Sequence, residues 1–152
     1  MCKKEDFKDK MELVFESRSE NEAFARVAVA AFVTRLDPTL EELDDMKTAV
    51  SEAVTNAIIH GYQGQAGNRV YISCEVKEEK RMMTVTIRDE GVGIADIEQA
   101  KEPLYTTRPE MDRSGMGFVF MEVFMDSLQV ESRPGEGTTI RMSKQFRKVI
   151  EE

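Results

Sequence analysis

Three polar side chains, Glu52, Asn56 and His60, recur at intervals of four residues. In an α-helix this spacing advances about 400° per step, so the three side chains form one stripe along the helix. One Asn carbonyl together with phosphate oxygens and water can hold Mg²⁺, and a Glu one turn away can act as a base. The stripe is equally compatible with the polar edge of an amphipathic helix, and His60 before Gly61 fits a C-terminal cap.

Asp89 directly follows a segment, 82–88, in which apolar and polar residues alternate. Its parity places the carboxylate on the inward face of the expected strand, where an unpaired charge is costly. The exocyclic amine of adenine would fit as a partner, because a carboxylate accepts N–H groups. Gly91 and Gly93 would leave room for a flat ring, although a plain turn explains both glycines as well. Thr138 shares the inward parity of the expected last strand, and its hydroxyl needs a ligand or a backbone partner there.

The segment 89–117 is rich in Gly, Pro, Thr and charged residues and is too long for a casual connection. Residues 114–117 stand directly before an expected helix, where free backbone N–H groups and the helix dipole favour an anion. A cation just before them could contact a terminal phosphate, and two threonines could close over a nucleotide or form an ordinary exposed loop. The residues concerned are Thr106, Thr107, Arg113, Ser114, Gly115, Met116 and Gly117.

Periodicity and capping residues predict the elements that position these side chains. Ser19 with Glu22, and Thr39 with Glu42, are capping-box signatures that begin two helices. The expected strands are 12–16, 70–77, 82–88, 128–132 and 138–144, and the expected helices are 19–36, 39–61 and 116–126. Helices dominate the first half and no βαβ alternation follows, which favours a two-layer α+β sandwich over a doubly wound fold.

Composition limits the class of protein. The chain has 152 residues, a formal net charge of −8 and 41% hydrophobic residues, which suits one domain with a core of its own. The negative field disfavours nucleic acid and anionic membranes, which are held first by Lys and Arg. Cys2 and Cys74 are too few for a disulfide framework, and the longest apolar run, 27–33, is too short to span a bilayer. We therefore expect a cytoplasmic protein that binds any phosphate through a few groups close to it and not through a basic surface.

Four short motifs, called boxes below, occur together and in this order: Glu52-x-x-x-Asn56-x-x-x-His60-Gly61, Asp89-x-Gly91-x-Gly93, Gly115-x-Gly117 and Gly137-Thr138. In this combination the chain resembles the GHKL ATP-binding superfamily. More closely, segments 21–32, 51–62, 85–94, 103–118 and 137–141 resemble the anti-sigma F factor family of serine-protein kinases. The resemblance implies a two-layer α/β sandwich of the GHKL (Bergerat) type, with a mixed, mostly antiparallel sheet and helices on one face. The expected organisation is a flexible leader over 1–10, one ATP-binding kinase domain over 11–147 and a tail over 148–152.

The resemblance also implies a role for each box. Glu52 would be the general base that takes the proton from an attacking serine hydroxyl, and Asn56 would ligate Mg²⁺. Asp89 would bind the adenine amine. The remaining positions would surround the nucleotide: Gly91, Gly93 and Thr138 near the adenine, and Thr106, Thr107, Arg113, Ser114, Gly115, Met116 and Gly117 around the phosphates, with Arg113 at the γ-phosphate.

Arg26 resembles the residue with which the family docks both of its protein partners. Val29 and Val33 lie on roughly the same side of the expected helix, which suits a protein interface. A buried packing helix with one exposed Arg is the alternative.

The implied function is a homodimeric switch. It would bind the sporulation sigma factor F, keep it from RNA polymerase, and use Mg-ATP to phosphorylate a serine of the anti-anti-sigma factor, leaving ADP. A general stress (sigma B type) anti-sigma kinase shares this fold and chemistry. A nucleotide-binding module that sequesters its partner without catalysis is a further alternative, which Glu52 disfavours because binding of Mg-ATP needs no base. A sensor histidine kinase is disfavoured because the sole His lies inside the first box.

Overall fold

The computed structural model describes residues 8–103 and 116–148, and its strands form one sheet. The strands are β1 (Lys8–Glu16), β2 (Arg69–Lys77), β3 (Met82–Asp89), β4 (Ser127–Arg133) and β5 (Gly137–Gln145). Their order is β1-β2-β3-β5-β4, and each of the four neighbouring pairs is antiparallel. A mixed, mostly antiparallel sheet was expected, and the described strands pair only in the antiparallel sense. Tight turns join β2 to β3 and β4 to β5, which imposes that sense on both pairs.

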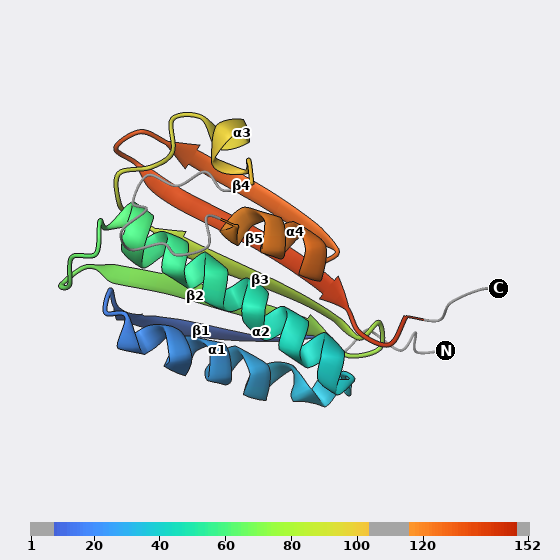
Figure 1. Ribbon diagram of the computed structural model, residues 1–152. Coiled ribbons are helices and arrows are strands. Elements are labelled where there is room, and N and C mark those ends of the chain that lie inside the picture. The colour runs from blue at the N-terminus through green and yellow to red at the C-terminus, as the bar shows by residue number, and fades with distance from the viewer. Residues whose placement is uncertain (1–7, 104–115, 149–152) are drawn as a thin grey trace, which may run out of the picture.

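Three helices cover one face of this sheet (Figure 1). They are α1 (Glu20–Val33), α2 (Leu40–Thr55) and α4 (Gly117–Phe124). A 3₁₀ turn, η1 (Thr34–Leu36), extends α1, a π-helix, η2 (Asn56–Gly61), extends α2, and a short helix, α3 (Ile97–Ala100), follows β3. The predicted two-layer α+β sandwich is confirmed. Within the described ranges, every helix is too short or too polar to cross a bilayer.

The core lies between the helices and the inward face of the sheet. The apolar positions of β2 and β3 that alternation placed on one face are all buried, which confirms the faces expected for both strands. From the other layer, α2 contributes five residues with no exposed surface, namely Met46, Ala49, Val50, Ala53 and Val54. The helix that carries the candidate catalytic residues is therefore also the centre of the core.

One of the two predicted capping boxes forms. Thr39 accepts a hydrogen bond from the Glu42 amide at 3.1 Å, and Glu42 accepts one from the Thr39 amide at 2.9 Å, as expected. Ser19 makes no side-chain cap, because its backbone is already helical (φ −56°, ψ −32°), whereas a capping residue is typically extended. Glu22 instead lies 3.5 Å from Arg26, one turn further along α1.

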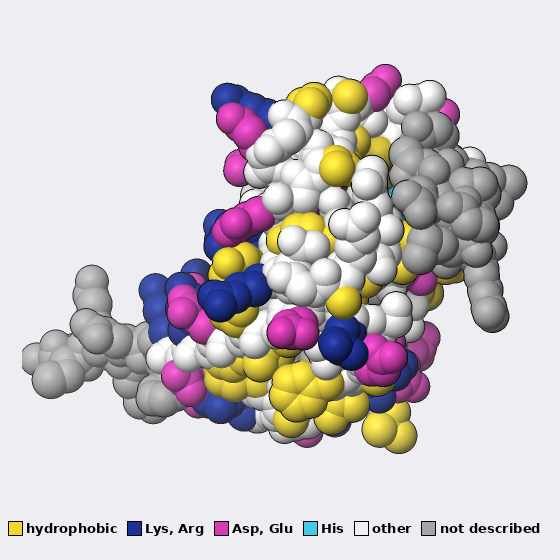
Figure 2. Space-filling view, turned by 90° about the vertical axis from the view of Figure 1, so that its left-hand side faces the viewer, with side chains coloured by type: hydrophobic (Ala, Val, Ile, Leu, Met, Phe, Trp, Pro, Cys, Tyr) yellow, Lys and Arg dark blue, Asp and Glu magenta, His cyan; other side chains and the backbone are white. Residues whose placement is uncertain are grey.

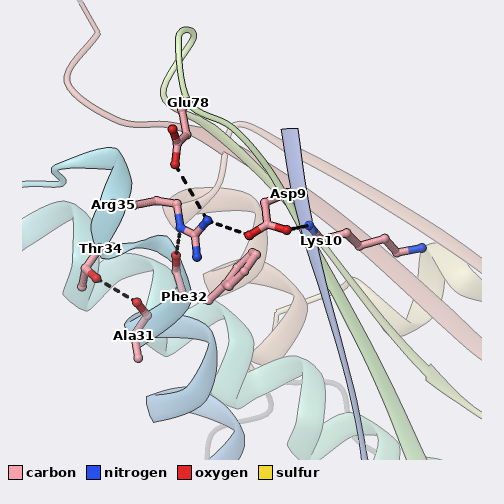
Figure 3. Close-up of polar contacts among 7 residues, drawn as sticks. All are labelled: Asp9, Lys10, Ala31, Phe32, Thr34, Arg35 and Glu78. Carbon is pink, nitrogen blue, oxygen red and sulfur yellow. Dashed lines mark hydrogen bonds and ion pairs between the residues drawn. The ribbon is translucent and has the colours of Figure 1, made fainter. Parts of the chain in front are cut away.

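Strand β1 begins at Lys8, four residues before the expected start and inside the segment 1–10 that was expected to be a leader. Arg35, which lies beyond the end of α1, contacts the first residues of β1 (Figure 3). Arg35 lies 2.7 Å from Asp9 and 3.8 Å from Glu78, and its guanidinium stacks 4.5 Å from the centre of the Phe32 ring. The hydrogen bond from Arg35 lowers the pKa of Asp9. These contacts join the helix layer to the edge strand.

Candidate active site

Glu52 and Asn56 lie where α2 changes into a π-helix. The sequence predicted an α-helix as far as Gly61, but the α-helix ends at Thr55 and residues Asn56–Gly61 take the wider π form. Such insertions occur often at functional sites. The change follows the last turn of α2, so the candidate base lies on the α-helix and the candidate metal ligand on the first residue of the π-helix.

Asn56 is suited to hold a ligand. The residue is only 8% exposed, yet its side-chain amide hydrogen-bonds to none of the described residues. An amide that is not committed to a protein partner is free to bind a ligand or water. The described residues form no cluster of three or more His, Cys, Asp or Glu side chains for a metal ion. An amide carbonyl, water and ligand oxygens do fit Mg²⁺, which prefers oxygen and retains water.

The Glu52 carboxylate points at the start of α4. A Cβ atom built on Gly117 would stand 3.1 Å from Oε2 of Glu52, so the first residue of α4 has no room for a side chain unless Glu52 moves. The first N–H groups of a helix have no partners within the helix and attract anions. The expected phosphate-binding residue Gly117 is thus brought next to the expected base.

Asp89 is buried as its parity predicted, with 3% of its surface exposed. Its Oδ1 accepts a hydrogen bond from the Gly91 amide at 2.9 Å. Burial raises the pKa of the carboxyl to about 6, while hydrogen bonds from the backbone amides of Gly91 and Thr138 act in the opposite direction. The carboxylate therefore keeps acceptor capacity in a place where water is scarce.

Three glycines around Asp89 are required by close packing rather than by a turn alone. A Cβ atom on Gly61 would lie 2.7 Å from Oδ1 of Asp89, and one on Gly91 would collide with the carbonyl of Gly61. The Val92 amide donates to that same carbonyl at 2.9 Å. Gly93 has a positive φ of 76°, and a Cβ there would collide with the Arg133 carbonyl. Sequence reasoning assigned Gly61 only to the helix end and missed its contact with Asp89.

Thr138 lies opposite Asp89 in the register of β3 and β5 and is 3% exposed, as predicted. Its hydroxyl is 2.8 Å from the hydroxyl of Ser132 on β4. Ser132 also accepts from the Ile94 amide at 2.7 Å and donates to the Gly137 carbonyl at 2.9 Å. Sequence reasoning missed Ser132, although its place among the inward positions of a strand was a signal that its hydroxyl needed a partner.

Tyr62 is a second residue that sequence reasoning missed. Its phenol donates to the Arg69 carbonyl at 2.5 Å and accepts from the Glu90 amide at 2.7 Å. It therefore fixes the residue after Asp89 to the start of β2. Burial raises the pKa of the phenol.

Several of the expected site residues cannot be placed. Thr106, Thr107, Arg113, Ser114 and Gly115 lie outside the described residues. Met116 precedes the first turn of α4, and its carbonyl accepts from the Phe120 amide at 2.9 Å. The described half of the site consists of the α2 and η2 residues, the loop after β3, and the ends of β4 and β5.

Arg26 lies on α1, but the surface expected beside it differs. Val29 and Val33 have no exposed surface and belong to the core, so the expectation that they form a protein interface is wrong. Helical spacing placed them correctly on one side, and that side packs on the sheet. Phe24 and Val27 are instead 56% and 58% exposed. Figure 2 shows the molecule from the left-hand side of Figure 1. Hydrophobic side chains gather along the lower edge of this view, at the level where α1 lies in Figure 1.

A cavity of about 620 Å³ lies at the end of β3, beside β4 and the start of β5. It is lined by Asp89, Ser132 and Gly137 together with side chains on the face that no helix covers, such as Arg88 and Thr139. Glu52 and Asn56 do not line it. The cavity therefore reaches Asp89 but not the helix-side residues Asn56 and Glu52.

Comparison with known proteins identifies the family of the chain. Residues 15–144 match the model of the histidine kinase-like ATPase domain. The anti-sigma F factor of Clostridium acetobutylicum is 60% identical over 138 residues, which are 91% of this chain and 94% of that protein. The anti-sigma F factors of Oceanobacillus iheyensis and Bacillus subtilis are 58% and 55% identical, each over 93% of this chain and 95% of the relative. The chain belongs to the anti-sigma F factor family.

The fold of this anti-sigma F factor family member has a solved counterpart. A crystal structure of the RsbU and RsbW domains of a Mycobacterium tuberculosis protein matches it with a TM-score of 0.63 at 13% identity, over 91% of this chain and 32% of that chain. At that identity the likeness concerns the fold alone. The match to a histidine kinase-like ATPase domain indicates, in general terms, a domain that uses ATP.

Proposed function

We propose that the chain is an anti-sigma factor and a serine-protein kinase. It binds the sporulation sigma factor F as a homodimer, keeps it from RNA polymerase in the cytoplasm, and uses Mg-ATP to phosphorylate a serine of the anti-anti-sigma factor. The observation that carries the proposal is the approach of the Glu52 carboxylate to Gly117 at the start of α4, with Asn56 one turn beyond on the same helix. The relatives named anti-sigma F factor support the choice of partners.

The chemistry follows from the positions of the described residues. Asn56 would hold Mg²⁺, which neutralises phosphate charge when bound. Glu52 would accept the proton from the attacking serine hydroxyl, so that the oxygen can form its bond to the γ-phosphorus while ADP leaves. Asp89 would accept an N–H of the adenine amine, which fixes the base at the far end of the site. Phosphoryl transfer depends mostly on positioning and on charge neutralisation, and these residues provide both.

The rest of the proposed site lies on the segment outside the described residues and on the loop after β3. Thr106, Thr107, Arg113, Ser114 and Gly115 would surround the phosphates together with Met116 and Gly117, as the resemblance implies. Gly91, Gly93 and Thr138 would border the adenine. A single domain over 11–147 would carry all of these functions.

Helix α1 is the proposed docking element. Arg26 is 39% exposed in its side chain and pairs with Glu22, and the exposed Phe24 and Val27 lie on the same short helix. A large apolar side chain beside an arginine is typical of an interface that buries an anchor. The buried Val29 and Val33 fix the helix to the sheet and take no part in docking.

Two alternatives remain distinguishable. A general stress (sigma B type) kinase would have the same site and a different sigma factor. A module without catalysis would bind nucleotide and sigma factor but transfer nothing. Glu52 near the start of α4 favours the kinase, because binding of Mg-ATP alone needs no general base, whereas phosphoryl transfer from ATP to a serine does.

The test is a transfer assay with γ-labelled ATP, Mg²⁺ and the anti-anti-sigma protein of the same genome, followed by identification of the labelled residue. Label on a serine is expected for the wild type. The Glu52→Gln variant should bind ATP and sigma factor normally and transfer no label. Glu41→Gln, at an exposed position at the start of the same helix, is the matched control and should transfer at the wild-type rate. Transfer by Glu52→Gln at the wild-type rate would refute the assignment of the base.

A further inference from the structure

The hydroxyl of Ser132 makes three hydrogen bonds, and a hydroxyl has only one proton to donate. The Ile94 amide donates to Ser132, so this bond uses an acceptor site of the oxygen. The carbonyl of Gly137 can only accept, so the Ser132 proton must point to it. The third bond, 2.8 Å to Thr138 Oγ1, must therefore take its proton from Thr138.

This count of protons fixes the direction in which the Thr138 hydroxyl donates its hydrogen bond. Its single hydroxyl proton points to Ser132, and the two lone pairs of its oxygen remain for other groups. Thr138 faces the same side of the sheet as its register partner Asp89, and both are 3% exposed. An ionised carboxylate is also an acceptor without a proton to donate. Asp89 and Thr138 thus offer acceptors and no side-chain donor.

We propose that Ser132 is a positioning residue that determines which purine the site accepts, because it holds the Thr138 proton away from the ligand. This inference rests on the proposed nucleotide site. Adenine carries an amine at position 6, whose two N–H groups suit a pair of acceptors. Guanine and hypoxanthine carry a carbonyl there, which meets two acceptors and loses its hydrogen bonds on entering a buried site.

Ser132 can act in this way because it joins three segments. It lies on β4, its amide partner Ile94 closes the loop after Asp89, and Gly137 and Thr138 begin β5. Without its hydroxyl, the proton of Thr138 loses its acceptor and can rotate toward a ligand carbonyl. The side chain of Ser132 itself contacts no nucleotide in this proposal, so its effect is exerted through Thr138.

The experiment measures the dissociation constants of Mg-ATP and Mg-ITP by calorimetry on the full chain. ITP differs from ATP in having a carbonyl at position 6 and a proton on the neighbouring N1. Wild type should prefer ATP, and Ser132→Ala should reduce the ratio of the two constants about five- to tenfold. Ser132→Thr keeps the hydroxyl and should restore the wild-type ratio. Ser127→Ala is the matched control, because Ser127 also pairs its hydroxyl with a hydroxyl of β5, that of Ser143, at 2.5 Å on the uncovered face.

A second comparison isolates the route through Thr138. In a Thr138→Val background, Ser132→Ala should leave the ratio unchanged, because there is no hydroxyl proton left to redirect. If Ser132→Ala does not fold, Ser132→Cys, with a weaker donor and acceptor of similar size, should lower the ratio by a smaller factor. An unchanged ratio in the folded Ser132 variant, or an equal change in Ser127→Ala, overturns this inference but leaves the proposed function standing. Failure of wild type to bind either nucleotide overturns the proposed function as well.

Discussion

The α-carbon of Gly61 packs directly against the carboxylate of Asp89. A Cβ at position 61 would stand 2.7 Å from Oδ1 and 2.9 Å from Oδ2. The π-helix that begins at Asn56 ends at this glycine, so the candidate metal ligand and the candidate adenine contact are joined by six residues of one helix. The distance between the two ends of the proposed site is thereby set by the backbone of this helix. Substitutions that disturb the contact of Gly61 with Asp89 should therefore lower the affinity for nucleotide.

Gly61→Ala should weaken ATP binding by at least about tenfold, because the new methyl group displaces Asp89 or the π-helix. The measurement is calorimetric titration with Mg-ATP, accompanied by thermal unfolding. Gly67→Ala is the control: its backbone has a positive φ of 92°, but among the described residues none beyond its two chain neighbours lies within 4 Å of the added carbon. It should cost about 1–2 kcal/mol of stability and leave ATP affinity unchanged. Equal ATP affinity in Gly61→Ala and wild type would contradict the role of the contact.

Nucleotide affinity should depend on the ionisation of Asp89. Burial raises the pKa of its carboxyl to about 6. A ligand amine requires the ionised form, so below pH 6 binding must displace a proton and affinity should fall about tenfold per pH unit. Above pH 6 this effect should vanish. Dividing the wild-type affinity by that of Asp89→Asn at each pH removes the titration of the phosphates, and a ratio that does not change between pH 5 and 7 would contradict the prediction.

The same carboxyl should affect stability without nucleotide. Its pKa in the folded protein lies above the 3.8 of an exposed aspartate, so the folded state takes up a proton more readily than the unfolded state. The stabilisation that this uptake gives is complete below about pH 4 and is lost as pH rises through 6. Asp89→Asn should therefore raise the midpoint of thermal unfolding relative to wild type at pH 7, with a smaller difference at pH 4.

Asn56→Ala should remove the effect of Mg²⁺ on ATP binding. The wild type should bind ATP more tightly with Mg²⁺ than with a chelator, because the Asn56 carbonyl would complete the coordination of the cation. The variant should bind ATP equally in both conditions. Thr48→Ala, at a half-buried position of α2 whose hydroxyl donates to the Asp44 carbonyl at 3.0 Å, is the control and should keep the difference. A full Mg²⁺ effect in Asn56→Ala would exclude Asn56 as the ligand.

Arg26→Ala should separate partner binding from folding. The ion pair with Glu22 is local to one helix, but its two atoms, Arg26 Nε and Glu22 Oε1, are buried without a hydrogen bond to any described residue. Removing Arg26 leaves Glu22 Oε1 without its cation and should lower the free energy of unfolding by about 1–3 kcal/mol, which the domain should tolerate. ATP affinity should persist, while affinity for sigma factor F should fall at least about tenfold. Arg18→Ala removes a similar pair, 3.4 Å from Glu16 and more exposed, and should leave partner binding intact. Equal sigma binding by both variants would count against the docking role.

Local patterns were enough to predict the five strands, the three long helices and the direction of several side chains, but not the π-helix after Thr55 or the short helix α3. Alternation identified the buried faces of β2 and β3 and the inward position of Asp89. The Thr39 cap depended on contacts within four residues and formed as expected. Each of these features follows from a short period or a short range of sequence.

The missed features depend on contacts between distant parts of the chain. Ser132 and Ile94 are 38 positions apart, and Tyr62 and Glu90 are 28 apart, so no local period relates them. The error over Val29 has another cause. Helix α1 is apolar on most of its circumference, and spacing alone cannot tell which side of such a helix the sheet covers.

Helix α2 packs against both α1 and α4, and its five residues Met46, Ala49, Val50, Ala53 and Val54 have no exposed surface. Amide hydrogens near Glu52 should therefore exchange with solvent only through global unfolding, at a rate set by the stability of the whole domain. The candidate base would then persist for as long as the protein stays folded. Loss of overall stability, even by a change far from the site, would raise the fraction of molecules in which the catalytic arrangement is lost.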